Sequence, residues 1–242
     1  MSSLPKIDQP IYNIKVPSLN KNIKFRPFLV KEEKLLLMSK ESANESDILG
    51  AIKQIVNNCS IDKTFNVDKI ALFDLEYIFL KLRAFSVNNL VKVSYKDYED
   101  EKVYDFDIDL NEIEVLFPEK VSNNIKISDN SGIVMNYPSA SLYEDKEFLS
   151  LTDNYMFELI LRCIDNIYVE DEIYEPSNYS KEELSDFLED MSLKVFEEIQ
   201  KFLLSVPKIE HKIKYKNSFG NDRVITLSSL NDFFSWRWII TL

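Results

Sequence analysis

The side chains best suited to chemistry in this sequence are carboxylates that gather near its middle. They are Asp97, Glu99, Asp100, Glu101, Asp105, Asp107 and Asp109. Such a group could hold a divalent cation and serve a metal-dependent hydrolase. A calcium loop also needs a glycine at its tight turn, however, and this segment has none. Because side chains alternate along a strand, Asp105, Asp107 and Asp109 share one face. The pattern therefore favours a solvated hairpin surface over a metal site.

A second acidic cluster follows a predicted helix in the last third of the chain. It consists of Glu170, Asp171, Glu172 and Glu175. Acid–base catalysis needs two carboxyl groups whose surroundings separate their pKa values, whereas these four lie close together and are expected to be solvated. They favour a charged loop.

The sequence also lacks the residues that nucleophilic catalysis, cysteine chemistry and phosphate binding require. The only histidine, His211, alternates with Ile209 and Ile213 on a predicted strand, which favours a solvent-facing or hydrogen-bonded side chain. Cys59 and Cys163 are far apart, and Cys59 completes an apolar helical stripe, so it is expected in the core. The three glycines are isolated and form no phosphate-binding loop. The sequence predicts a protein that is not an enzyme and has no cofactor, no metal and no small-molecule substrate.

Composition narrows the choice of partners. The 242 residues include 29 Lys and Arg and 41 Asp and Glu, so the formal charge is −12. Proteins that hold nucleic acid neutralise its phosphates with Lys and Arg, so no nucleic-acid partner is expected. No stretch approaches the ~20 apolar residues that span a bilayer, and the N-terminal residues have no apolar run of signal-peptide length. No membrane contact is expected either, and the predicted location is cytoplasmic.

Apolar patterns predict an α+β fold with several β-hairpins, a buried central helix and a C-terminal helical group. The first third combines a hairpin at 11–29, a helix at 30–42 and a second helix capped by Ser46. Residues 69–85 form the most apolar helix, whose charges fall in two narrow stripes. We expect this helix to lie between other elements at the centre of the core.

The rest of the chain repeats both kinds of element. Hairpins are expected at 90–95 with 102–109, at 125–128 with 132–137, and at 209–215 with 223–227. Helices are expected at about 154–167, after the capping box of Ser180 and Glu183, and after Ser192. No linker or repeat marks a boundary, so one structural unit is expected. Its approximate lobes are 1–89, 90–150 and 151–242.

Aromatic side chains at the two ends of the chain are candidates for a protein interface. They are Phe25, Arg26 and Phe28 near the start, and Phe233, Phe234, Trp236, Trp238 and Ile239 near the end. Tryptophan is enriched at interface hot spots, and both tryptophans fall in the last seven residues. The alternative is that these side chains fold onto the protein's own core, which is favoured for the first group.

Several stretches resemble a known family. In KFRPFLVKEEKLLL (24–37) a hairpin leads through RPF into a charged helix that ends in leucines. This order resembles baseplate hub subunits and hub assembly proteins of T-even-like contractile-tailed phages (myoviruses). Further similar stretches are FDLEYIFLKLR (73–83), GIVMNYPS (132–139), CIDNIYVEDEIYE (163–175), EIQKFLLSVPKIEHKIKYKN (198–217) and LSSLNDFF (227–234).

The resemblance implies a non-enzymatic late protein of tail morphogenesis that is made in the host cytoplasm and contacts other phage baseplate or hub proteins. A structural subunit would stay in the virion tail baseplate, whereas an assembly chaperone would be absent from the mature virion. The residues leave both open. A different class, motivated by the charge of −12, is an acidic inhibitor of a basic host protein.

One departure from the family concerns metal. Some relatives carry cysteine pairs in the middle and C-terminal hairpins, which resemble the two halves of a zinc ribbon. The corresponding turns here, at 96–101 and 217–222, contain no cysteine. If the hairpins pair in space, side-chain contacts must hold them without metal. We therefore predict a fold without a metal-stabilised zinc ribbon, and no stoichiometric zinc on elemental analysis of the purified protein.

Overall fold

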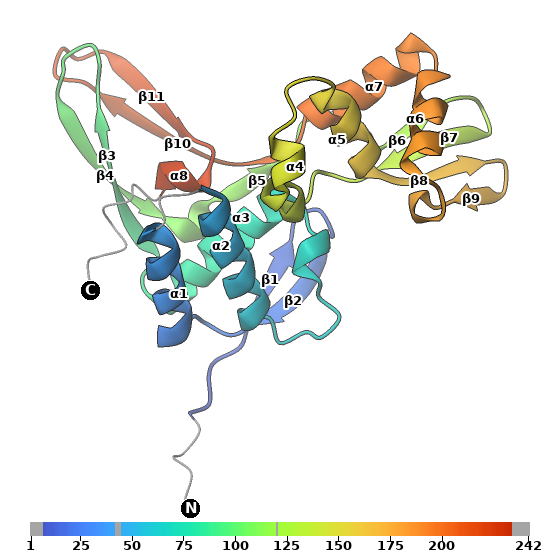
Figure 1. Cartoon of the computed structure of the whole chain (residues 1–242). Coiled ribbons are helices and arrows are strands. Elements are labelled where there is room, and N and C mark those ends of the chain that lie inside the picture. The colour runs from blue at the N-terminus through green and yellow to red at the C-terminus, as the bar shows by residue number, and fades with distance from the viewer. Residues whose placement is uncertain (1–6, 42–44, 120, 234–242) are drawn as a thin grey trace, which may run out of the picture. The chain divides into compact units, whose positions relative to one another are not determined.

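The computed structural model describes residues 7–41, 45–119 and 121–233 (Figure 1). The chain forms two compact units, which are described separately. Unit 1 consists of two separate segments of the chain, Met1–Leu116 and Lys208–Leu242, and unit 2 is the segment between them, Phe117–Pro207. The lobe boundaries expected near residues 90 and 150 fall inside these units. The unit boundaries are not visible in the sequence because unit 1 is completed by a hairpin from the end of the chain.

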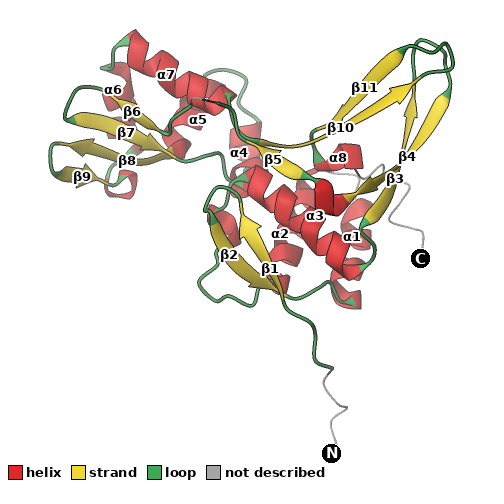
Figure 2. Ribbon diagram, turned by 180° about the vertical axis from the view of Figure 1, so that it is seen from behind, coloured by secondary structure: helices red, strands yellow, loops and turns green. Residues whose placement is uncertain are grey.

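Unit 1 combines short antiparallel sheets with a group of helices, as the predicted α+β class requires (Figure 2). Its helices are α1 (Val30–Glu41), α2 (Glu45–Cys59), α3 (Leu72–Ser86) and α8 (Leu230–Phe233). Its strands are β1 (Tyr12–Val16), β2 (Lys21–Phe25), β3 (Leu90–Lys96), β4 (Val103–Asp109), β5 (Glu114–Leu116), β10 (Lys208–Lys216) and β11 (Asp222–Leu227). The sheets are β1–β2, β3–β4 and β11–β10–β5. The predicted hairpins at both ends and in the middle are confirmed.

Helix α3 is the centre of unit 1, which confirms the prediction of a buried central helix. Leu75, Ile78, Leu80 and Leu82 have no exposed surface. Two charged side chains of α3, Asp74 and Lys81, are buried as well. A buried charge is tolerated only where hydrogen bonds replace water, and both have such partners.

The two buried charges tie α3 to neighbouring loops. Asp74 accepts hydrogen bonds from the backbone amide of Ser18, at 3.0 Å, and from its hydroxyl, which holds the β1–β2 turn. The Lys81 ammonium donates to the carbonyls of Leu110, Asn111 and Ile113 at 3.0, 2.7 and 3.0 Å. Lys81 thereby fixes the connection from β4 to β5, and so helps to set where the β3–β4 hairpin leaves the core.

Unit 2 packs helices against one four-stranded antiparallel sheet in the order β6–β7–β8–β9. The strands are β6 (Asn124–Lys126), β7 (Ser131–Met135), β8 (Ile164–Val169) and β9 (Glu172–Tyr174). The helices are α4 (Lys146–Leu149), α5 (Tyr155–Cys163), α6 (Lys181–Glu189) and α7 (Leu193–Leu204). Among its core side chains, Ile133, Phe148, Ile160 and Ile199 are fully buried.

Local signals in unit 2 are confirmed at the caps of two helices. Ser180 and Glu183 form the predicted capping box, with N–H···O distances of 2.8 and 3.2 Å, at the start of α6. The Ser192 hydroxyl accepts from the Val195 amide at 3.4 Å and caps α7. Ser46 does not cap as predicted, because α2 already begins at Glu45 and places Ser46 inside the helix.

The helix predicted at 154–167 is too long. Helix α5 ends at Cys163, and Ile164 begins strand β8, which pairs with β7 on one side and β9 on the other. Residues such as Ile164 and Ile167 satisfy a helical period, but they are β-branched and are buried by sheet pairing. Tertiary pairing therefore overrides the helical pattern in the last four residues.

Candidate functional site

Two hairpins of unit 1, β3–β4 and β10–β11, meet at their tips. Tyr215 of β10 contacts the other hairpin, with ring centroids 4.9 Å from Tyr104, 5.3 Å from Phe106 and 6.5 Å from Tyr95. These four residues alternate with exposed neighbours along their strands. The period-two pattern therefore builds an aromatic layer between the hairpins.

Each tip is shaped by its own polar side chains. In the first turn, Asp97 accepts from the Glu99 amide at 2.8 Å, and Asp100 accepts from the Lys102 amide at 3.0 Å. In the second turn, the side-chain oxygen of Asn217 accepts from the amides of Phe219 and Asn221 at 3.1 and 3.0 Å. Asp and Asn favour turns because their short side chains reach the backbone two residues on.

The two tips are joined by hydrogen bonds in which one turn supplies the acceptors and the other supplies the donors. The Tyr215 hydroxyl donates to Asp97 at 2.5 Å, and Asn217 and Asn221 donate to the two Glu99 oxygens at 2.6 and 2.7 Å. The amide and the hydroxyl of Ser218 donate to Asp100 at 2.9 and 2.8 Å. We call this set of residues, with Arg223, the tip clasp.

Charge reinforces the tip clasp. The Arg223 guanidinium lies 3.2 Å from an Asp97 oxygen and 3.6 Å from a Glu99 oxygen. Hydrogen bonds from Tyr215 and from the Glu99 amide lower the pKa of Asp97. Burial opposes ionisation of Asp100, but bonds from Tyr104 and Ser218 prevail and lower its pKa. Burial and the bond to Asp97 raise the pKa of Tyr215 to about 12. The carboxylates are thus held ionised and the phenol protonated, as the bonds require.

The clasped end of the hairpins also presents apolar surface. Tyr98 in the first turn is 83% exposed and Phe219 in the second turn is 67% exposed. Tyr98 directly follows Asp97, and Phe219 directly follows Ser218, and both of these neighbours form hydrogen bonds to the other hairpin. Large exposed aromatic side chains on a fixed frame are suited to anchor a partner, because little conformational freedom remains to be lost on binding.

The two hairpins do lie together in space, and side-chain hydrogen bonds and aromatic contacts join them. The sequence points to the acids of the first turn but predicts a solvated surface there, whereas Asp97 is buried. The sequence does not single out Asn217, Ser218 and Asn221, whose only signal is their turn chemistry. Asp105 and Asp107 do lie on the exposed face of β4, as predicted for a solvated surface. Within residues 7–41, 45–119 and 121–233, no group of three or more His, Cys, Asp or Glu could hold a metal ion.

The aromatic residues predicted as an interface at the start of the chain belong mainly to the core. Phe25 is fully buried and meets Phe65 edge-on at 5.5 Å, and Phe28 packs against Phe79 at 5.6 Å. Arg26 binds Glu32 at 2.9 Å and the Asn58 carbonyl at 2.8 Å. Arg26 is therefore engaged within unit 1.

Of the five interface candidates near the end of the chain, only Phe233 lies in the described part. Phe233 is fully buried at the end of α8, so it is a core residue and not a surface anchor. Phe234, Trp236, Trp238 and Ile239 lie outside the described residues. Both cysteines are buried, which confirms the core assignment of Cys59. His211 is partly buried on β10, opposite Leu227.

The helices and hairpins define an α+β protein in which two hairpin tips, joined by hydrogen bonds, expose the aromatic side chains of Tyr98 and Phe219. The family model described as T4 bacteriophage base plate protein matches residues 9–235, and the chain belongs to this family. Neither the comparison with curated proteins nor that with solved structures finds a match. Among the described helices, none is long and apolar enough to cross a membrane.

Proposed function

We propose that this baseplate protein is a structural or assembly component of the baseplate hub of a contractile tail, and that it acts through protein–protein contacts and not by catalysis. The observation that carries the proposal is the match of the baseplate family to residues 9–235. The hub assignment is supported by the stretches that resemble hub subunits and hub assembly proteins, such as residues 24–37 and 73–83.

The contact surface that we assign to this role is the clasped end of the two hairpins, with Tyr98 and Phe219 as anchors. The test is complementation of an infection that lacks the gene product. The double variant Tyr98→Ser, Phe219→Ser is compared with Leu193→Ser, Leu204→Ser, which removes two equally exposed apolar side chains from α7. We expect the tip variant to lower the yield of complete baseplates at least tenfold and the α7 variant to restore it. Normal baseplates without any gene product would refute the proposal.

The structural role and the assembly role differ in whether the protein is present in the mature virion. A structural subunit remains in the virion tail, whereas an assembly chaperone leaves before the particle is complete. Mass spectrometry of purified virions separates the two, because only the subunit would be present at a constant number of copies per tail. The family match favours the structural role, since a baseplate protein is expected in the baseplate.

An acidic inhibitor of a basic host protein is the second candidate, and one observation favours it. Unit 2 contains 19 Asp and Glu against 7 Lys and Arg, so it accounts for the whole charge of −12, while unit 1 is neutral. A concentrated negative charge speeds association with a basic partner. Capture of a host protein in infected cells, with affinity that falls steeply between low and physiological salt, would support this function. Salt-independent capture would exclude it.

A further inference from the structure

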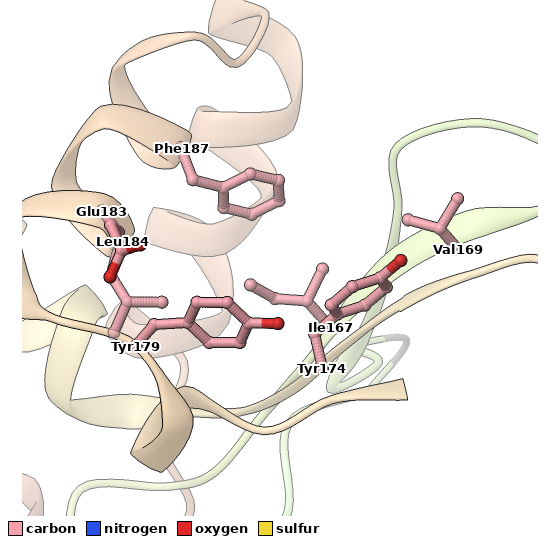
Figure 3. A pocket seen from close by; sticks show the side chains of 7 residues that line it. All are labelled: Ile167, Val169, Tyr174, Tyr179, Glu183, Leu184 and Phe187. Carbon is pink, nitrogen blue, oxygen red and sulfur yellow. The ribbon is translucent and has the colours of Figure 1, made fainter. Parts of the chain in front are cut away.

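Unit 2 contains an apolar groove of about 330 Å³ between helix α6 and the β8–β9 hairpin (Figure 3). Its sheet side is formed by Ile167, Val169 and Tyr174, and its helix side by Leu184 and Phe187. The register pairs Ile167 with Tyr174 and Val169 with Glu172, so these residues share one face of the hairpin. The volume lies at the low end of the range of about 300–1,000 Å³ for ligand sites, which suits one or two aromatic side chains.

Carboxylates stand on both sides of this groove. Glu183 of α6 lines it, and Glu172 lies opposite Val169 on the sheet side. The one basic residue of α6, Lys181, is paired with Glu158. In the part of the chain that the structure describes, neither Glu172 nor Glu183 forms an ion pair, so the groove combines an apolar floor with negative charge at its edges. An occupant that fits is a segment with aromatic side chains next to Lys or Arg and with no acidic residue.

The chain itself contains such a segment outside its described part. Residues 234–242 read FSWRWIITL, with Arg237 between the chain's two tryptophans and no Asp or Glu. The segment directly follows Phe233, which is fully buried in unit 1. Nine residues reach up to about 30 Å when extended, which is long enough to fill a groove on another molecule.

We propose that residues 234–242 of one copy dock into the α6/β8–β9 groove of a second copy, with the indoles on the apolar floor and Arg237 near Glu172 and Glu183. Charge favours this head-to-tail arrangement over a symmetric contact between two groove faces. Two copies of unit 2, each at −12, repel each other, whereas unit 1 is neutral and delivers the basic segment. A head-to-tail contact is heterologous and can build rings or chains of subunits.

The inference goes beyond the proposed function and does not depend on which baseplate protein is the partner. Its test uses the purified full chain, because Trp236 and Trp238 are the only tryptophans and report on the segment alone. We expect a blue shift of tryptophan emission as protein concentration rises, in step with dimer or oligomer formation by analytical ultracentrifugation. Arg237→Glu should weaken the association at least tenfold, and high salt should weaken it as well.

A matched pair of variants on one hairpin tests the groove. Val169→Gln places a polar side chain on the groove face, where Val169 is 44% exposed. Ile173→Gln makes the same kind of change on the opposite face, where Ile173 is 70% exposed and pairs with Tyr168. We expect at least a tenfold loss of association for Val169→Gln and less than a twofold change for Ile173→Gln.

Three results would overturn the inference. The first is a chain that stays monomeric at all concentrations, and the second is equal association of Val169→Gln and Ile173→Gln. The third is tryptophan emission that is blue-shifted at every dilution, which would mean that the segment is covered within its own molecule. None of these results bears on the complementation test above, so failure of the inference and failure of the proposed function are distinguishable.

Discussion

The substitution Asn217→Asp should open the tip clasp while leaving the second turn intact. The new carboxylate keeps the oxygen that accepts from the Phe219 and Asn221 amides at 3.1 and 3.0 Å. It replaces the amide that donates to Glu99 at 2.6 Å with a second negative group. Hydrogen bonds to charged groups contribute about 1.5–3 kcal/mol, and Glu99 is partly solvated, so we expect a loss near 2 kcal/mol in the free energy of unfolding.

Two measurements follow from that value. For a unit of about 150 residues, a loss of 2 kcal/mol lowers Tm by roughly 4–8 °C. The Ser218 amide, which donates to Asp100 at 2.9 Å, should exchange with solvent about 30-fold faster if the tips open by the same free energy. Thermal unfolding and hydrogen exchange of the full chain test both expectations.

The control is Asn22→Asp, which introduces the same charge at an exposed position of β2 opposite Lys15 in the same unit. We expect it to leave Tm and Ser218 exchange unchanged. Asn217→Ala also removes the two accepted amide bonds, so it should lower stability further than Asn217→Asp. If Asn217→Asp behaves like Asn22→Asp, the hydrogen bonds of Asn217 do not hold the tips together, and the aromatic layer alone must do so.

Three further predictions concern titratable groups. Burial raises the pKa of Glu76 to about 7 from 4.5, so the folded chain keeps a proton that the unfolded chain releases, and stability should fall as pH rises between these values. Glu76→Gln should remove this dependence and stabilise the protein at pH 8 by on the order of 3 kcal/mol in denaturant unfolding. The pKa values of Asp97 and Asp100 are lowered, so the tip clasp should persist above about pH 4 and open as pH falls through their folded pKa values, seen as faster Ser218 exchange. Burial raises the pKa of both cysteines to about 12, so a thiol reagent at pH 8 should label neither until the chain unfolds.

The elements of the fold were largely predictable, because their signals are local. The hairpins follow from side-chain alternation and the buried α3 from an apolar surface on two faces. The helix expected at 154–167 is wrong at its end because Ile164 and Ile167 fit the helical spacing of apolar residues but can equally belong to a buried strand. Only pairing with β7, whose residues lie about 30 positions earlier, decides that they form a strand.

The candidate sites were less predictable, because each is made by residues far apart in the chain. Glu99 and Asn217 are separated by 118 positions, and nothing in either turn alone specifies the other as its partner. The resemblance to proteins with paired hairpins suggested the pairing but not the carboxylate-to-amide bonds. The groove of unit 2 likewise needs α6 to lie against β8, which no local pattern encodes.

The division of charge between the units changes how the acidity of the chain is understood. Averaged over the sequence, a charge of −12 favours general solubility. When the charge is counted for each unit, unit 1 is neutral and unit 2 carries the whole −12. The clasp acids of unit 1 are hydrogen-bonded to the other hairpin, whereas carboxylates of unit 2 flank an apolar groove. The proposed contact at Tyr98 and Phe219 is apolar, so it should depend less on salt than the proposed binding at the groove. Measuring the salt dependence of each association separately would tell which of the two surfaces a given partner uses.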